Sequence, residues 1–154
     1  MRAVVQRVSG AQVLVDGDVV GEIGLGLCVL LGVARGDGEA AAERLAGKVA
    51  RLRIFENAEG KFERSVLDVH GSALVVSQFT LIADTAKGNR PNFTSAAPPE
   101  QAERLYEGFC EALGGHGIDI AKGRFGAHMA VELVNDGPVT IVLDTDATTV
   151  AGAG

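Results

Sequence analysis

Two continuous apolar runs limit the fold of this chain more than any other feature. Residues 25–33 carry no polar side chain, and residues 73–79 carry polar side chains only near their carboxyl end. A strand with one face in solvent alternates apolar and polar residues, whereas an unbroken apolar run of this length is typical of a strand buried on both faces. We therefore expect a sheet whose central strands are covered on both sides by other parts of the chain.

Two further segments have the apolar spacing of amphipathic helices. We expect the first to begin at Gly38, capped by Asp37, and the second to begin at the proline pair 98–99, because proline suits the first turn of a helix. The glycine pair 114–115 then ends the second helix. The apolar positions are Ala42, Leu45, Ala46, Val49 and Leu52 in the first helix and Ala102, Leu105, Tyr106, Phe109, Cys110 and Leu113 in the second.

Shorter segments bounded by turn residues predict the remaining strands, including a hairpin whose turn is Asp16-Gly17-Asp18. The resulting order is strands, helix, strands, helix, strands, which lacks the strict βαβ alternation of a doubly wound nucleotide-binding fold. The sequence thus predicts one α+β domain at residues 1–145 with a mixed or antiparallel sheet, followed by a flexible C-terminal tail at residues 146–154. The expected shorter strands are residues 2–8, 12–15, 19–23, 54–56, 61–62, 117–121, 129–134 and 139–143.

The net charge of −6 argues against a surface that wraps a nucleic-acid backbone. Glutamates cluster on the predicted helices, whereas four basic residues lie beside glycines in predicted loops. Such a basic rim on an acidic body could hold one end of a nucleic acid, although solvated loop charges explain the same pattern. The four basic residues are Lys87, Arg90, Lys122 and Arg124.

The sequence also indicates a compartment. Cys28 and Cys110 lie inside apolar runs, so we expect buried, reduced thiols rather than a disulfide or a metal pair. The first residues are too polar for a signal peptide, and no apolar run reaches the roughly 18 residues of a membrane span. We therefore expect a cytoplasmic protein.

A glycine-proline pair lies between the last two predicted strands, in the segment Asn135-Asp136-Gly137-Pro138. Glycine lacks a Cβ and proline locks φ and removes an amide donor, so this corner is bare of side chains and presents carbonyl oxygens. From these residues alone we expect an ordinary hairpin turn with a trans bond, because only about 5–6% of X-Pro bonds in folded proteins are cis.

Conventional catalytic machinery is poorly represented in the sequence. The three histidines lack the spacing of metal ligands, so no metal site is expected. A triad drawn from Ser77, His70 and Asp84 has no supporting pattern, because the GxSxG elbow is absent. The remaining candidates are the glycine-proline corner and the segment 77–80 (Ser-Gln-Phe-Thr), which ends a buried strand. That segment could equally be a strand end with polar caps.

Both motifs and much of the remaining chain resemble the D-aminoacyl-tRNA deacylase family. The departures are few: Ile82 stands where an aromatic residue often follows Thr-Leu, His128 replaces a common acid, and residues 145–154 have no evident counterpart. The matching segments, in family order, are MRAVVQRV at residues 1–8, VDG at 15–17, LRIF at 52–55, VSQFTL at 76–81, KGNRP at 87–91, APPE at 97–100, GRFGA at 123–127 and VNDGPVT at 134–140.

The resemblance implies a barrel-like α+β fold with two main helices. It also implies an enzyme that needs no cofactor and hydrolyses the ester between a D-amino acid and the terminal adenosine of tRNA. The expected partners are tRNA and a second copy of the chain, with no DNA and no membrane. In such a homodimer the active site lies at the subunit interface, and a cis Gly137-Pro138 corner from one subunit rejects L-amino acids in the other. Glycyl-tRNA, which has no side chain to reject, would be admitted.

Individual residues acquire roles through the same resemblance. Ser77 and Thr80 would shape the site, backbone amides near Phe79 and Thr80 would hold the oxyanion, and the ribose 2′-hydroxyl of the tRNA would assist the attacking water. Covalent catalysis by Thr80 is the alternative. The other implied contacts are Gln78, Phe79, Phe125 and Met129 beside the adenosine; Asn135, Gly137 and Pro138 at the corner, braced by Arg7; and Lys87, Arg90, Lys122 and Arg124 on the tRNA.

Two other functions stay open at this point. The same scaffold could serve a small-molecule D-amino-acid esterase or amidase, which would act on free esters without tRNA. It could also serve a nucleic-acid-binding module that holds tRNA and releases no amino acid.

Overall fold

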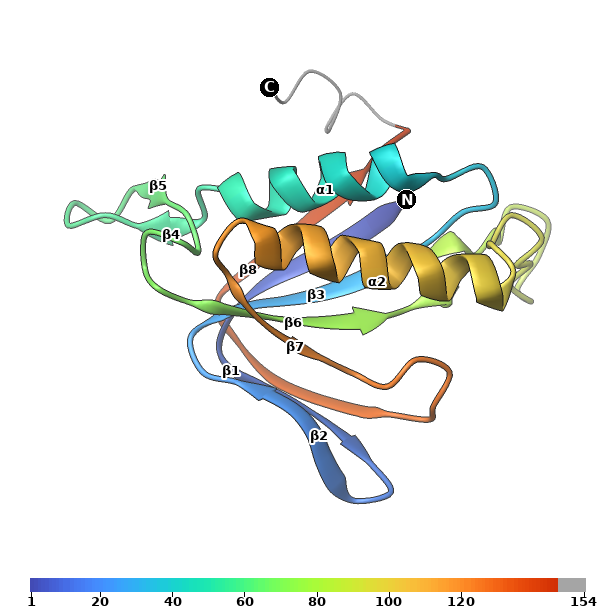
Figure 1. The fold of residues 1–154 in the computed structure, drawn as a ribbon, viewed down its shortest axis with the longest axis horizontal. Helices are drawn as coiled ribbons and strands as arrows, with labels where there is room; N and C mark the ends of the chain where they lie inside the picture. The colour runs from blue at the N-terminus through green and yellow to red at the C-terminus, as the bar shows by residue number, and fades with distance from the viewer. Residues whose placement is uncertain (147–154) are drawn as a thin grey trace.

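The computed structural model of this chain describes residues 1–146, which form a strongly curved mixed sheet with two helices on one face (Figure 1). The main sheet of this part of the chain has six strands, in the order β2-β1-β3-β6-β7, with β8 on the other edge of β1. The bounds are β1 Arg2–Val15, β2 Asp18–Ile23, β3 Gly26–Gly32, α1 Glu39–Arg51, β4 Phe55–Glu56, β5 Phe62–Arg64, β6 Ser72–Ser77, a short 3₁₀ helix Phe79–Ile82, α2 Pro99–Gly115, β7 Asp119–Lys122 and β8 Ala130–Asp144. The prediction of a single α+β domain with a mixed sheet and two main helices is confirmed.

Strand β1 organises the sheet because it pairs with three other strands. It runs antiparallel to β8 along almost its whole length, while its other edge pairs first with β3 and then with β2. The sequence predicted two separate strands at residues 2–8 and 12–15, and this is wrong. Residues 9–11 have no clear alternation of apolar and polar side chains, but pairing with β8 on both sides keeps them in one strand. The hairpin between β1 and β2 is as predicted, with positive φ at Asp16 and Gly17 in its turn.

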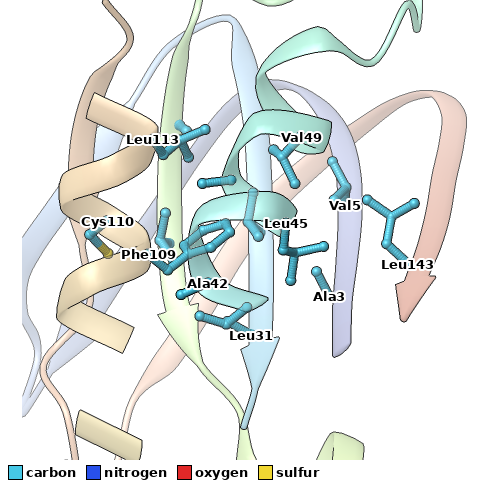
Figure 2. Packing of buried hydrophobic residues seen from close by; sticks show 14 of the residues in the cluster. Ala3, Val5, Leu31, Ala42, Leu45, Val49, Phe109, Cys110, Leu113 and Leu143 are labelled. Carbon is cyan, nitrogen blue, oxygen red and sulfur yellow. The ribbon is translucent and has the colours of Figure 1, made fainter. Parts of the chain in front are cut away.

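Strands β3 and β6 are buried on both faces, as their unbroken apolar sequences predicted. They pair in parallel, and β6 pairs in parallel with β7. Leu31 of β3 faces the core beneath the helices, where Figure 2 shows it near Leu45 of α1 and Phe109 of α2. The opposite faces of β3 and β6, at Cys28 and Leu74, belong to a second apolar cluster inside the curve of the sheet.

The two helices lie side by side across the sheet (Figure 1). Helix α2 has the bounds and the buried stripe that its sequence predicted, and the Tyr106 hydroxyl donates to the Val75 carbonyl at 2.7 Å. Burial raises the pKa of Tyr106, so this hydroxyl stays protonated and the hydrogen bond ties α2 to β6.

The predicted cap of α1 is wrong. The N-cap residue of α1 is Gly38, and no side chain caps the helix. The Asp37 carboxylate instead accepts the Ala34 amide at 2.7 Å and pairs with the Met1 ammonium group at 2.7 Å. The buried ammonium group of Met1, the residue before β1, thus takes the carboxylate in place of the helix end, because a buried charge requires an opposite charge beside it.

The end of the described chain belongs to the core rather than to a tail. Thr145 is buried, its amide donates to the Met1 carbonyl at 2.9 Å, and its hydroxyl accepts from the Met1 ammonium group at 2.8 Å. Residues 147–154 of the predicted tail lie outside the described residues.

Both cysteines are free and buried, as predicted. Burial raises the pKa of Cys28 to about 11 and that of Cys110 to about 12, because a thiolate is poorly solvated in an apolar interior. At neutral pH they are therefore thiols and contribute no nucleophile. No helix within residues 1–146 combines the length and the apolar character that crossing a membrane requires.

The sheet curls until its two outer strands almost meet. Gly21 of β2 lies so close to β7 that a Cβ on it would stand 2.3 Å from the Lys122 carbonyl oxygen. This approach of β2 to β7 makes the sheet nearly a closed barrel, which agrees with the predicted barrel-like fold. It also requires glycine, because a methyl group would collide with backbone that cannot rotate away.

We predict that Gly21→Ala lowers the free energy of unfolding by about 3 kcal/mol, the upper end of the cost of overpacking. Gly24→Ala is the matched control, since a Cβ at Gly24 would meet no atom within 4 Å. The control should change the free energy by less than about 1 kcal/mol. Urea unfolding of both variants measures the difference, and equal midpoints would contradict the close approach of β2 to β7.

Candidate active site

The segment Ser-Gln-Phe-Thr forms a tight turn at the carboxyl end of β6. The Gln78 amide donates to the Leu31 carbonyl at 2.8 Å, after which the chain leaves the sheet and enters the 3₁₀ helix Phe79–Ile82. Gly32 of β3 gives this turn room, because a Cβ there would stand 3.1 Å from the Gln78 carbonyl oxygen. The sequence predicted a strand through residue 79 and missed this helix, which is too short for a periodic signal.

The turn presents two backbone amides and a hydroxyl toward solvent. Within residues 1–146, the amides of Phe79 and Thr80 have no hydrogen-bond partner. The Thr80 hydroxyl accepts from the Gln78 side-chain amide, and no histidine or carboxylate of this part of the chain bonds to it. Thr80 therefore has no neighbouring base to activate it, whereas the two amides are free to donate to a ligand.

A cavity of about 660 Å³ opens beside this turn, within the size range of small-molecule sites. Phe79 lines this cavity and is 55% exposed. Its ring packs edge to face against that of Phe93, with 4.9 Å between the ring centroids. Of the predicted site residues, Ser77, Gln78, Phe79, Phe125 and Met129 line this cavity, and Thr80 follows them directly in the turn.

Several residues of the cavity wall had no place in the site predicted from the sequence. Arg35 comes from the loop after β3, Phe93 from the polar loop at residues 83–98, and His128 from the loop before β8. The two prolines that open α2 also line it. The loop residues carry no local pattern, and only the fold brings them together. The one available signal was that aromatic residues are rare in this chain, which makes Phe93 in a polar loop unusual.

The glycine-proline corner is not a hairpin turn. Both apolar runs around it belong to the single strand β8 and continue along the same partner, β1. Asn135 pairs with Val8 and Thr140 pairs with Gln6, so residues 136–139 leave the ladder opposite Arg7 alone. The Gly137-Pro138 peptide bond is cis, and Gly137 has a φ of 134°. The predicted hairpin and the trans bond expected from local sequence are therefore wrong, while the cis bond implied by the resemblance is present.

Two side chains hold this corner from below. The Asn135 side-chain amide donates to the Arg7 carbonyl at 2.9 Å and to the Val139 carbonyl at 3.0 Å, which closes the base of the excursion. Arg7, only 7% exposed, donates from Nε to the Asp136 carbonyl at 3.1 Å and from Nη1 to the Ile54 carbonyl at 2.9 Å. Each buried donor thus has a partner, and the corner has a defined position.

Charged and aromatic groups further fix the Arg7 guanidinium. It lies 3.7 Å from the Glu56 carboxylate and 3.6 Å from the Asp136 carboxylate, and 5.7 Å from the centre of the Phe62 ring. A Cβ on Gly137 would stand 3.2 Å from Nη2 of Arg7, so the arginine packs directly under the glycine. Arg7 and Asn135 thus contact the backbone on either side of Gly137 and Pro138.

The corner and the cavity are separate within one chain. Gly137 and Pro138 are exposed, and neither lines the cavity beside Ser77. The structure therefore brings the predicted residues together in two groups, one at the end of β6 and one in the middle of β8.

The four predicted basic residues lie outside the lining of the cavity. Lys122 pairs with Glu107 at 2.8 Å, and this hydrogen bond raises the pKa of Lys122. Lys87, Arg90 and Arg124 are exposed, but none of the four lines the cavity. In the described part of the chain, no group of three or more histidine, cysteine, aspartate or glutamate side chains is arranged to hold a metal ion.

Comparison with known proteins gives a consistent result. The family model described as D-Tyr-tRNA(Tyr) deacylase matches residues 4–144. A D-aminoacyl-tRNA deacylase of Ruegeria pomeroyi is 62% identical over 144 residues, which cover 94% of this chain and 99% of the relative. One from Roseiflexus castenholzii is 61% identical over 145 residues, covering 94% of this chain and 92% of the relative.

Solved structures show the same fold. The structure titled "c-Myc DNA Unwinding Element Binding Protein" superposes with a TM-score of 0.88 at 46% identity, over 94% of this chain and 98% of that one. A probable eukaryotic D-amino acid tRNA deacylase shares the fold with a TM-score of 0.79 at 18% identity, over 92% of this chain and 97% of that one. From the family model and these closely similar relatives, the chain belongs to the D-Tyr-tRNA(Tyr) deacylase family.

Proposed function

We propose that this protein hydrolyses the ester bond of D-aminoacyl-tRNA and releases free tRNA and a D-amino acid. The observation that carries the proposal is the family match over residues 4–144, which includes both the turn after β6 and the corner in β8. The cavity beside the turn has the volume for an aminoacyl-adenosine end, and its aromatic wall suits a base. Such a substrate places the enzyme in the cytoplasm.

The ester carbonyl lies against the turn in this proposal. The free amides of Phe79 and Thr80 donate to the oxyanion that forms when water attacks, and such preorganised donors are worth about 10²–10³ in rate each. Ser77 and Gln78 shape the same edge of the cavity, while Phe79, Phe125 and Met129 contact the adenosine.

A second copy of the chain completes the site. The corner is exposed and lies outside the cavity of its own chain, so it is free to enter the cavity of a partner. On β8 either side of it, Val134 is 62% exposed and Val142 is 59% exposed, and burying such apolar side chains favours association. In the homodimer, Gly137 and Pro138 therefore face the partner's ester site.

The corner then reads handedness by exclusion. A D-amino acid and its L form differ by exchanging a hydrogen and a side chain at one carbon, so a rigid backbone wall can admit one and reject the other. The carbonyls at the corner accept hydrogen bonds from the substrate ammonium group. Glycine has no side chain to exclude, so glycyl-tRNA is also a substrate.

The tRNA itself supplies part of the chemistry. An aminoacyl ester is already reactive, and Thr80 has neither histidine nor carboxylate as a bonded partner within residues 1–146. The 2′-hydroxyl of the terminal ribose lies next to the ester and orients the attacking water. Thr80 and Ser77 shape the site and form hydrogen bonds in it, and neither forms a covalent intermediate.

We expect D-tyrosyl-tRNA to be deacylated about a thousandfold faster than L-tyrosyl-tRNA, a difference of about 4 kcal/mol that one severe clash can supply. Release of labelled tyrosine measures both rates, with free D-tyrosine ethyl ester as a third substrate. Rapid hydrolysis of the free ester would instead support a small-molecule esterase. Binding of tRNA without release would support a non-catalytic module.

Substrate that ends in 2′-deoxyadenosine should react at least a hundredfold more slowly, the loss expected when a positioned proton-transfer group is removed. The Thr80→Ala variant should keep activity within about tenfold of the parent protein on normal substrate. An undiminished rate on the 2′-deoxy substrate, or complete loss of activity in the Thr80 variant, would point to a covalent mechanism.

Asn135→Ala should lower kcat/KM for D-tyrosyl-tRNA by about ten- to a hundredfold, because a corner displaced by about 1 Å no longer matches the substrate. The matched control is Gln12→Ala, which removes a 2.8 Å side-chain bond to Glu132 between the same two strands but away from the corner. The control should stay within about twofold. Equal effects of both variants would show that general strand pairing matters and the corner's position does not.

A further inference from the structure

Arg35 is held at the rim of the cavity with one end of its guanidinium free. Its amide donates to the Ser95 carbonyl at 3.0 Å, and its carbonyl accepts from the Gln101 side chain at 3.0 Å. Its Nε donates to the Thr94 carbonyl at 2.6 Å, which fixes the direction of the side chain. Within residues 1–146 the two terminal nitrogens of Arg35 have no partner, so a positioned pair of donors is available to a ligand.

His128 contributes a second donor to the same cavity from a different loop. It lies between β7 and β8, is exposed, and has no hydrogen-bond partner in the described part of the chain. Residues 124–127, just before His128, form a turn in which the Ala127 amide donates to the Arg124 carbonyl at 3.1 Å. The cavity wall therefore carries the two terminal nitrogens of Arg35 and the His128 imidazole, none of which has a hydrogen-bond partner within residues 1–146.

No carboxylate opposes these two groups in the cavity wall. Among the described residues that line it, Arg35 and His128 are the titratable ones, although the chain as a whole has a net charge of −6. Glu100, in the first turn of α2, is exposed and lies outside the lining, and Asp37 is paired with the Met1 ammonium group. A second cavity, between α1 and α2, has the opposite charge, because four glutamates and one arginine line it.

We propose that Arg35 and His128 bind a phosphate group of the tRNA acceptor end, next to the terminal adenosine in the cavity. The inference rests on the proposed function and names the residues that hold the RNA backbone at that site. Arginine suits this role because its fork of donors matches two phosphate oxygens. Lys122 suits it less, since its ammonium group is already paired with Glu107.

Two small substrates isolate this contact from the rest of the tRNA. In the parent protein, 3′-D-tyrosyl-adenosine 5′-phosphate should have a KM about tenfold lower than 3′-D-tyrosyl-adenosine, the gain expected from a charge-assisted hydrogen bond to the phosphate. In Arg35→Gln and in His128→Gln that advantage should shrink to less than about threefold. A folding defect would instead lower kcat on both esters by the same factor and leave the ratio of the two KM values unchanged.

The matched control is Arg104→Gln, which removes the same charge from an exposed arginine of α2 outside this cavity. On D-tyrosyl-tRNA, KM should rise in the Arg35 and His128 variants and stay unchanged in the control. In the Arg35 variant, the slope of log affinity against log salt concentration should fall by about 0.7, the value for one lost phosphate contact to a cation. A phosphate advantage and a salt slope that survive in both variants would overturn the proposal.

Binding of uncharged tRNA separates this proposal from the proposed function. Should the parent protein hydrolyse none of these esters and still bind tRNA through Arg35 and His128, the phosphate contact would stand and the deacylase function would fall. Should it hydrolyse D-tyrosyl-tRNA with equal KM in the parent protein and both variants, the reverse would hold.

Discussion

The antiparallel pairing of β1 with β8, and its interruption opposite Arg7, is the constraint on which the rest of the structure depends. Four residues of β8 leave the ladder where a regular pair would place one. The Asn135 amide and the Arg7 guanidinium take over the carbonyls that the ladder would otherwise satisfy. Arg7 is buried, and its Nε and Nη1 both donate to backbone carbonyls. It can therefore support the exposed backbone of Gly137 and Pro138, which carries no bulky side chain. The corner is accessible and still fixed, a combination that a surface loop rarely offers.

The same strand also determines where the second half of the site lies. The amino-terminal part of β1 pairs with β3, and β3 pairs in parallel with β6, so the end of β6 is placed by the sheet rather than by its own loop. Gly32 and the Leu31 carbonyl then direct the chain out of the sheet at Gln78. Both groups of site residues thus rest on one framework of backbone hydrogen bonds, which the Asn135 and Arg7 side chains complete at the corner. The corner nevertheless lies outside the lining of the cavity in its own chain, which is why a second copy enters the proposed mechanism.

Elements whose conformation depends on neighbouring residues in the sequence were predicted correctly. The errors occur where a contact with a distant segment determines the conformation. Burial on both faces gives β3 and β6 unbroken apolar runs, and burial of one face gives α1 and α2 apolar residues at helical spacing. Both patterns can be recognised in the sequence. A glycine-proline pair between two apolar runs looks the same whether the chain reverses or merely bulges. Only the pairing of both runs with β1 distinguishes the two. Asp37 likewise has the position of a helix cap but pairs with the ammonium group of Met1, the residue before β1. Arg35, Phe93 and His128 were missed because loops without periodicity bring them to the cavity.

Charge is distributed in a way that suits a small RNA contact on an acidic protein. Glu39, Glu43, Glu107 and Glu111 line the groove between the helices, away from the cavity beside β6, whose wall contains no carboxylate. Long-range attraction to a polyanion is therefore weak, and only a site with oriented donors gains from a phosphate. An arginine with one nitrogen already bonded to Thr94 loses little freedom when its remaining donors bind. The proposed selectivity for the end of an RNA then rests on a few such donors beside a cavity that is bordered by aromatic rings.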